Sequence, residues 1–90
     1  MASKAEIGWK SRNVEGEKRD VYAQHFGGKW IIFDRAARFD QWTKLENPPL
    51  VYWLELLDAV RRRIPRRLIR PEEEELIITE IRERFPEAEI

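Results

Sequence analysis

Cysteine is absent from this 90-residue sequence, and histidine occurs once, at His25. Without cysteine the chain has no disulfide, no thiolate nucleophile and no thiolate metal ligand. Serine occurs only at Ser3 and Ser11, near the N-terminus, and His25 is the only histidine, so the sequence argues against a serine-type hydrolase. We therefore expect no catalytic residues and no enzymatic activity.

Ordered motifs for metals and cofactors are also missing. The glutamates of 72–75 lack the spacing of an EF-hand loop, and the Gly-Gly-Lys triplet at 27–29 lacks that of a phosphate-binding loop. No pattern places two acidic residues in one cleft among the remaining candidates, Asp34, Asp40, Glu46 and Asp58. We expect no metal, no cofactor, no small-molecule substrate and no acid–base catalysis.

Neither sign of charge is in excess, and no long apolar run is present. The 17 lysines and arginines balance the 17 aspartates and glutamates. No segment approaches the roughly 18 apolar residues of a membrane-spanning helix, and the first residues lack the apolar core of a secretory signal. We expect a cytoplasmic protein with a single domain over residues 1–90 and loose ends at 1–5 and 87–90.

Two segments rich in β-branched and aromatic residues, 20–26 and 29–33, flank Gly27 and Gly28. Two glycines adopt the positive φ angles of a type I′ turn without strain, so this pattern predicts a β-hairpin. The turn sets the register. One face then carries the pairs Phe26–Lys29, Gln24–Ile31 and Tyr22–Phe33, and the other carries His25–Trp30, Ala23–Ile32 and Val21–Asp34.

The segments beside the hairpin are less regular. We expect a short strand at residues 7–12 and a polar loop at 12–20. For residues 34–47 two structures compete: a third strand around 39–45, or a short helix that begins after Asp34. Periodicity does not separate the two over so short a run. We favour the strand, which extends the sheet.

Two helices are predicted in the C-terminal half. The first has Asn47 as its N-cap, with Pro48 and Pro49 in its first turn, and it ends near Arg63 because Pro65 disfavours helical geometry before it. Its apolar stripe is Leu50, Trp53, Leu54, Leu57, Val60 and Ile64.

The second helix begins at Pro71, carries acidic residues in its first turn and stops at Pro86. Its buried stripe is Ile77, Ile78, Ile81 and Phe85, and the expected mutual core is Trp53, Leu57, Val60, Ile77, Ile81 and Phe85. The fold class that follows is α+β: a small antiparallel sheet, made of the hairpin and one or two further strands, followed by two C-terminal helices packed on one face.

Both faces of the predicted hairpin are substantially apolar, whereas two helices cover only one of them. We favour the helices on the Trp30 face, because Ala23 permits close approach there, with His25 packed beside Trp30. Trp30, Trp42 and Trp53 are expected to supply bulk to the core; the alternative is that one or more of the tryptophans anchors an interface. The residues left for contact with a protein partner or a second copy are Tyr22, Phe26, Ile31 and Phe33. The favoured function is therefore a non-catalytic interaction module or a homodimer.

A dense basic run, Arg61, Arg62, Arg63, Arg66, Arg67 and Arg70, lies between the helices. The alternative function is a nucleic-acid-binding accessory protein that uses this run, and an acidic protein partner is a further possibility for the same residues. We favour a structural role instead, because cations suit the C-terminal end of a helix and Asp58 can pair with Arg62. Glu74 falls on the buried stripe while Glu73 faces away, so we expect Glu74 to pair with Arg66, Arg67 or Arg70.

Overall fold

The hairpin predicted from Gly27 and Gly28 forms the centre of the sheet. In the computed structural model, which describes residues 6–90, strands β2 (Lys18–Phe26) and β3 (Lys29–Arg35) pair antiparallel. Gly27 and Gly28 both have positive φ, at 60° and 79°, as a type I′ turn requires. All six predicted cross-strand pairs form, so the register is confirmed.

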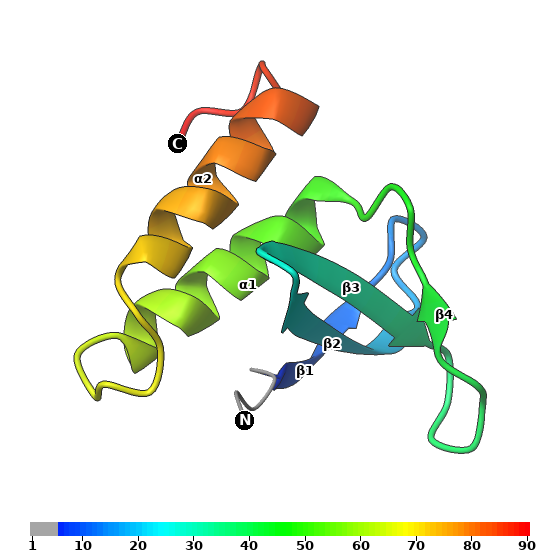
Figure 1. Cartoon of the computed structure of the whole chain (residues 1–90). Helices are drawn as coiled ribbons and strands as arrows, with labels where there is room; N and C mark the ends of the chain where they lie inside the picture. The colour runs from blue at the N-terminus through cyan, green and yellow to red at the C-terminus, as the bar shows by residue number, and fades with distance from the viewer. Residues whose placement is uncertain (1–5) are drawn as a thin grey trace.

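Strands β1 (Glu6–Arg12) and β4 (Thr43–Lys44) flank the hairpin and complete an antiparallel sheet of order β1-β2-β3-β4 (Figure 1). The strand favoured around 39–45 is confirmed, although it shortens to two residues. The loop expected at 12–20 is also shorter, because the strand pairing continues from Arg12 to Lys18 across the β1–β2 connection.

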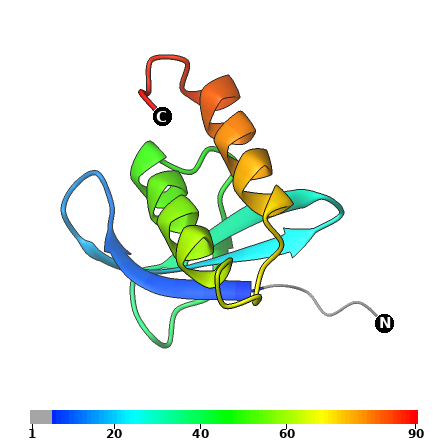
Figure 2. The same cartoon turned by 90° about the vertical axis from the view of Figure 1, so that its left-hand side faces the viewer.

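Helices α1 (Leu50–Arg63) and α2 (Glu72–Arg84) lie together on one face of the sheet (Figures 1 and 2), which confirms the predicted α+β architecture. Helix α1 ends where Pro65 predicts. The expected N-cap is wrong: Pro49 takes the cap position, in extended geometry and without a side-chain cap, and Asn47 lies outside the helix. The reason is that each proline disfavours helical geometry in the residue before it.

The core lies between the helices and the Trp30 face of the hairpin, as favoured from the sequence. Five residues of the predicted mutual core are buried, and Phe85 packs partly buried against them. The predicted stripe of α1 is mostly confirmed, since Trp53, Leu57 and Val60 are buried and Leu50 and Ile64 pack partly buried against the core. Leu54 is misplaced, at 37% exposed, and the stripe omits the buried residues Tyr52, Leu56 and Ala59. Helix α1 contacts both β1 and α2, so it needs apolar residues on two sides, and a single stripe does not describe it.

The two ends of the chain differ in what the structure describes. The loose end expected at residues 1–5 lies outside the described residues. At the other end, Ala88 packs against the core, and Arg82 Nη2 donates a hydrogen bond to the Ile90 carbonyl oxygen at 3.0 Å. Within residues 6–90, no helix has the length and apolar character needed to cross a bilayer.

Candidate functional site

The sheet face turned away from the helices, here called the outer face, is the candidate site. Alternate residues of each strand lie on it, and the loop of residues 36–42 hangs on the same side (Figure 2). Tyr22, Phe26, Ile31 and Phe33, the four predicted contact residues, all lie on this face. The outer face is formed by Glu6, Gly8, Lys10, Arg12, Lys18, Asp20, Tyr22, Gln24, Phe26, Lys29, Ile31, Phe33, Arg35 and Lys44.

Three aromatic rings gather at the middle of the outer face. Tyr22 and Phe33 lie directly opposite each other on β2 and β3, with their rings stacked at a centroid distance of 4.6 Å and an interplanar angle of 6°. Trp42 meets Tyr22 edge to face at 4.6 Å and 86°. We call Tyr22, Phe33 and Trp42 the aromatic cluster. Burial, and secondarily the charge of Glu6, raise the pKa of the Tyr22 hydroxyl.

The expectation that Trp42 belongs to the core is wrong. Its side chain is 37% exposed on the outer face, just before the two-residue strand β4. The Arg35 guanidinium carbon lies 4.2 Å from the centroid of the Trp42 ring, which is a cation–π contact. A core position does not follow from tryptophan's size, because a ring held by one aromatic neighbour and one guanidinium is stabilised at the surface.

A hollow of about 820 Å³ lies beside the aromatic cluster, over Gly8 of β1. Gly8 stands directly opposite Tyr22, and its missing side chain leaves the flank of the Tyr22 ring uncovered. The lining of this Gly8 hollow includes the rings of Tyr22 and Trp42 and four charged residues, Glu6, Lys10, Asp20 and Arg35. The hollow is open to solvent and adjoins both aromatic rings and charged groups. A flat or apolar side chain of a partner fits beside the rings, and polar groups next to that side chain can contact the charged residues.

Ion pairs organise one border of the aromatic cluster. Asp20 lies between Lys10 and Arg35 on neighbouring strands, at 3.2 Å from the Nζ of Lys10 and 3.2 Å from the Nε of Arg35. The hydrogen bond from Lys10 is the main cause that lowers the pKa of the Asp20 carboxyl, and Arg35 adds to it. At the opposite border, Gln24 Nε2 donates to Glu6 Oε1 at 2.8 Å.

The outer face carries more positive charge than the chain as a whole. Its six cations, Lys10, Arg12, Lys18, Lys29, Arg35 and Lys44, face only two carboxylates, Glu6 and Asp20, an excess of four in a chain of zero net charge. Within residues 6–90, Lys18, Lys29 and Lys44 have no carboxylate partner and are exposed.

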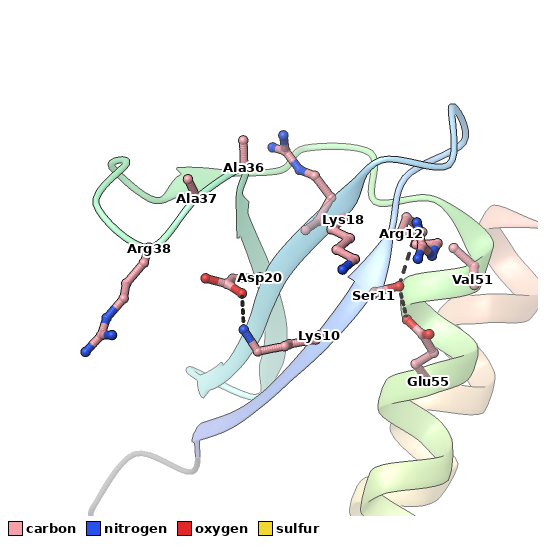
Figure 3. Close-up of a pocket in the computed structure, with 11 residues that line it drawn as sticks. Lys10, Ser11, Arg12, Lys18, Asp20, Ala36, Ala37, Arg38, Val51 and Glu55 are labelled. Atoms are coloured by element: carbon pink, nitrogen blue, oxygen red, sulfur yellow. Dashed lines mark hydrogen bonds and ion pairs between the residues drawn. The ribbon is translucent and has the colours of Figure 1, made fainter.

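A second hollow, of about 600 Å³, lies at the end of β1 and β2 near the β1–β2 loop (Figure 3). Lys10, Arg12 and Lys18 line it together with Glu55 of α1, while Arg38 points away from the Lys10–Asp20 pair (Figure 3). Arg12 Nη1 donates to the Gly16 carbonyl oxygen at 2.7 Å, which holds the guanidinium at the loop. This hollow continues the basic character of the outer face beyond its aromatic middle.

The arginine run between the helices is largely engaged within the chain. Arg62 pairs with Asp58 at 3.3 Å as predicted, and Arg70 pairs with Glu72 at 3.2 Å. The predicted partners of Glu74 are wrong, because Glu74 pairs with Arg61 at 2.6 Å. The two helices pack against each other on either side of a short connection, and this brings the last turn of α1 beside the first turn of α2. Arg63 Nη1 donates to the Ala59 carbonyl oxygen.

Glu73, not Glu74, turns inward, which reverses the expectation from the helical wheel. The side chain of Glu73 is 12% exposed and that of Glu74 is 30% exposed. Trp30 Nε1 donates to Glu73 Oε1 at 3.0 Å, and His25 Nε2 lies 3.2 Å from the same oxygen. His25 packs beside Trp30 as expected, with ring centroids 5.1 Å apart. The Glu73 carboxylate thus connects the first turn of α2 to Trp30 and His25 of the hairpin.

The acidic residues considered for catalysis are not brought together. Asp34 is buried on the inner side, where it accepts two hydrogen bonds from Arg19, at 3.1 and 3.0 Å, and one from the Tyr52 hydroxyl at 3.0 Å. Burial and the bond to Asp34 raise the pKa of Tyr52 to about 12. Among residues 6–90 no group of three or more histidines or carboxylates is arranged to hold a metal ion.

Several residues of the outer face were not predicted: Gly8, Lys10, Arg35, Trp42 and Lys44. The hairpin register already put Arg35 one step beyond the Val21–Asp34 pair, so that signal was present in the sequence. The pairing of β1 with β2 and the position of the Trp42 ring depend on tertiary packing. In comparisons with known proteins, no family model, no curated protein and no solved structure matches this chain.

Proposed function

We propose that the chain is a non-catalytic cytoplasmic interaction module that binds a protein partner through its outer face. The observation that carries the proposal is the aromatic cluster, which lies on the side of the sheet away from both helices. Aromatic residues are enriched where protein surfaces meet, and contiguous exposed apolar groups are uncommon without a partner. Phe26, 57% exposed, extends the apolar area toward the hairpin turn.

A homodimer through the same face is the second form of this proposal, and charge disfavours it. Two outer faces packed together would oppose two surfaces that each carry an excess of four positive charges, which costs free energy at an interface. A different protein with a complementary surface avoids this repulsion. Nucleic-acid binding by the arginine run is the alternative, and we favour it less because Arg61, Arg62 and Arg70 already pair with carboxylates.

Site-specific photo-cross-linking in cells of the source organism tests the proposal. A photoreactive phenylalanine analogue replaces Phe26 or Ile31 on the outer face, and the matched control replaces Leu76 of α2, which is 45% exposed. We expect one shared protein adduct from the two outer-face positions and none of it from position 76. The purified adduct partner should then bind the parent chain and bind the Ile31→Ser variant more weakly. An adduct from position 76 alone, or a partner indifferent to Ile31→Ser, contradicts the proposal.

A further inference from the structure

The outer face combines lysines that have no carboxylate partner among residues 6–90 with a cluster of aromatic rings, and this combination points to one kind of partner. Building on the proposed function, we infer that the outer face binds an acidic segment of a protein. Carboxylates of that segment contact the lysines, and one apolar or flat side chain enters the Gly8 hollow. The inference concerns the chemistry of the partner, whereas the proposed function concerns only the surface used.

Charge complementarity is the first step. Lys18 and Lys44 project from β2 and β4 on the outer face, exposed and without a carboxylate partner among residues 6–90. Lys44 lies directly opposite Phe33, so a cation stands at the border of the aromatic cluster. Lys29 adds a third such cation at the hairpin turn. A partner of negative charge gains from all three, and its encounter with the face is accelerated.

The contacts of the rings favour one of two classes of anionic partner. Bases of single-stranded nucleic acid bind by stacking on open ring faces. Tyr22 and Phe33 each cover one face of the other, and the Arg35 guanidinium covers one face of Trp42. One face of each of these three rings is therefore taken up within the chain, which leaves less ring surface for the stacking of bases. Ring edges carry partial positive charge, so carboxylate oxygens suit them better than bases do.

The Gly8 hollow supplies the position for an anchoring side chain. A Cβ at Gly8 would lie 3.8 Å from the Val21 carbonyl oxygen and 3.9 Å from the Tyr22 Cβ, which are ordinary contacts. The backbone therefore does not require glycine at this position. Because glycine has no side chain, it leaves space beside Tyr22. A side chain of the partner that enters there is buried against Tyr22 and Trp42.

Fluorescence anisotropy with defined probes tests the inference on the purified chain. The first probe is a labelled glutamate-rich peptide with one central phenylalanine. The others are the same peptide with lysine in place of glutamate, and an oligothymidylate of equal charge. We expect the acidic peptide to bind with the highest affinity and to weaken with added salt. The double variant Lys18→Glu/Lys44→Glu reverses two charges on the outer face and should lower the affinity for the acidic peptide by about ten- to thirtyfold.

Two further variants separate the parts of the inference. Gly8→Val fills the hollow with a residue that favours strands, so it should keep the fold and lower peptide affinity several-fold. Arg66→Glu/Arg67→Glu reverses the same number of charges outside the outer face and should leave the affinity unchanged.

Three results would overturn the inference: no binding of the acidic peptide, tighter binding of the oligothymidylate, or affinity that falls only in the Arg66/Arg67 variant. Self-association of the isolated chain that Lys18→Glu/Lys44→Glu abolishes, seen by light scattering, would make a second copy the occupant and would overturn it too. None of these binding results decides the proposed function, which is tested separately by the cross-linking experiment.

Discussion

Each face of the sheet carries one aspartate, and the two carboxylates have different surroundings. Asp34 faces inward, is buried, and is enclosed by Arg19 and the Tyr52 hydroxyl. Asp20 faces outward and is shared between Lys10 and Arg35, on the border of a surface that remains open. A buried carboxylate must be fully satisfied within the chain, whereas an exposed one leaves its neighbours available to a partner. Successive residues of a strand face opposite sides of the sheet, so inward residues support stability and outward residues are available for contact with a partner.

The largest difference between the faces should come from two adjacent isoleucines of β3. Ile32 is buried on the inner face, and Ile31 is half-buried on the outer face. We expect Ile32→Ala to lower the free energy of unfolding by about 2–4 kcal/mol because it leaves a cavity, and Ile31→Ala to lower it by less than about 1 kcal/mol. Urea denaturation of the two variants measures this. Equal losses would mean that something also covers the outer face.

Glu73 and Glu74 offer a second matched pair. Glu73→Ala leaves the Trp30 indole N–H without its acceptor and removes the carboxylate beside His25, which should cost about 1–2 kcal/mol. Glu74→Ala removes an exposed pair with Arg61 and should cost about 0.5 kcal/mol. Both variants lose one charge from the same helix end, so that contribution cancels in the comparison. A larger loss for Glu74→Ala in thermal unfolding would restore the assignment made from the sequence.

The buried Tyr52 and the outer-face Tyr22 should contribute differently to the pH dependence of stability at alkaline pH. The pKa of Tyr52 is raised to about 12, above the value of about 10 for an exposed tyrosine, so the folded chain holds this proton more tightly than the unfolded chain. Its contribution to stability is complete below about pH 10 and is lost as the pH rises toward 12. Unfolding between these pH values should depend on pH less steeply in Tyr52→Phe than in the parent. Tyr22→Phe should change that dependence less, and the opposite order would contradict the assignment.

The smallest effect on stability should come from the outer-face lysines. Lys18→Glu/Lys44→Glu replaces two exposed cations that have no carboxylate partner among residues 6–90, and we expect a change within about 0.5 kcal/mol. Circular dichroism during urea unfolding checks this. A larger loss would show that the lysines support the fold, and the binding experiment would then need single variants.

The hairpin was predictable in detail because a two-residue turn leaves no freedom in register. Gly27 and Gly28 set six cross-strand pairs, and those pairs in turn set which side chains share a face. Ala23 then identified the face that the helices approach. Four contact residues could be placed on the outer face from these short-range rules alone.

The errors arise where one element contacts two others. Helix α1 packs against both β1 and α2, so the apolar positions of Tyr52 and Leu56 are as buried as those of the predicted stripe. Glu73 was placed outward because the wheel of α2 was oriented on Ile77 and Ile81 alone. Trp30 and His25 of the hairpin approach the other side of that helix. Helical periodicity describes one interface well and does not describe two.

Trp42 shows a further limit of sequence reasoning. A tryptophan next to a short strand is compatible with the core or with the surface, and propensity does not decide between them. Its position is set by Tyr22 on one side and Arg35 on another, both from different strands. Such placement depends on the register of β3 with β4, which spans two residues.

The order of the strands has a consequence for how the chain folds. Every strand pairs with its neighbour in sequence, and the two helices follow each other across a short connection, so most of the structure forms from segments close together along the chain. Topologies rich in such local contacts fold fast. The contact of β1 with α1 is of long range, because Glu55 of α1 accepts hydrogen bonds from Trp9 and Ser11 across more than 40 residues of sequence. We therefore expect the hairpin and its aromatic pair on the outer face to form before β1 and α1 join.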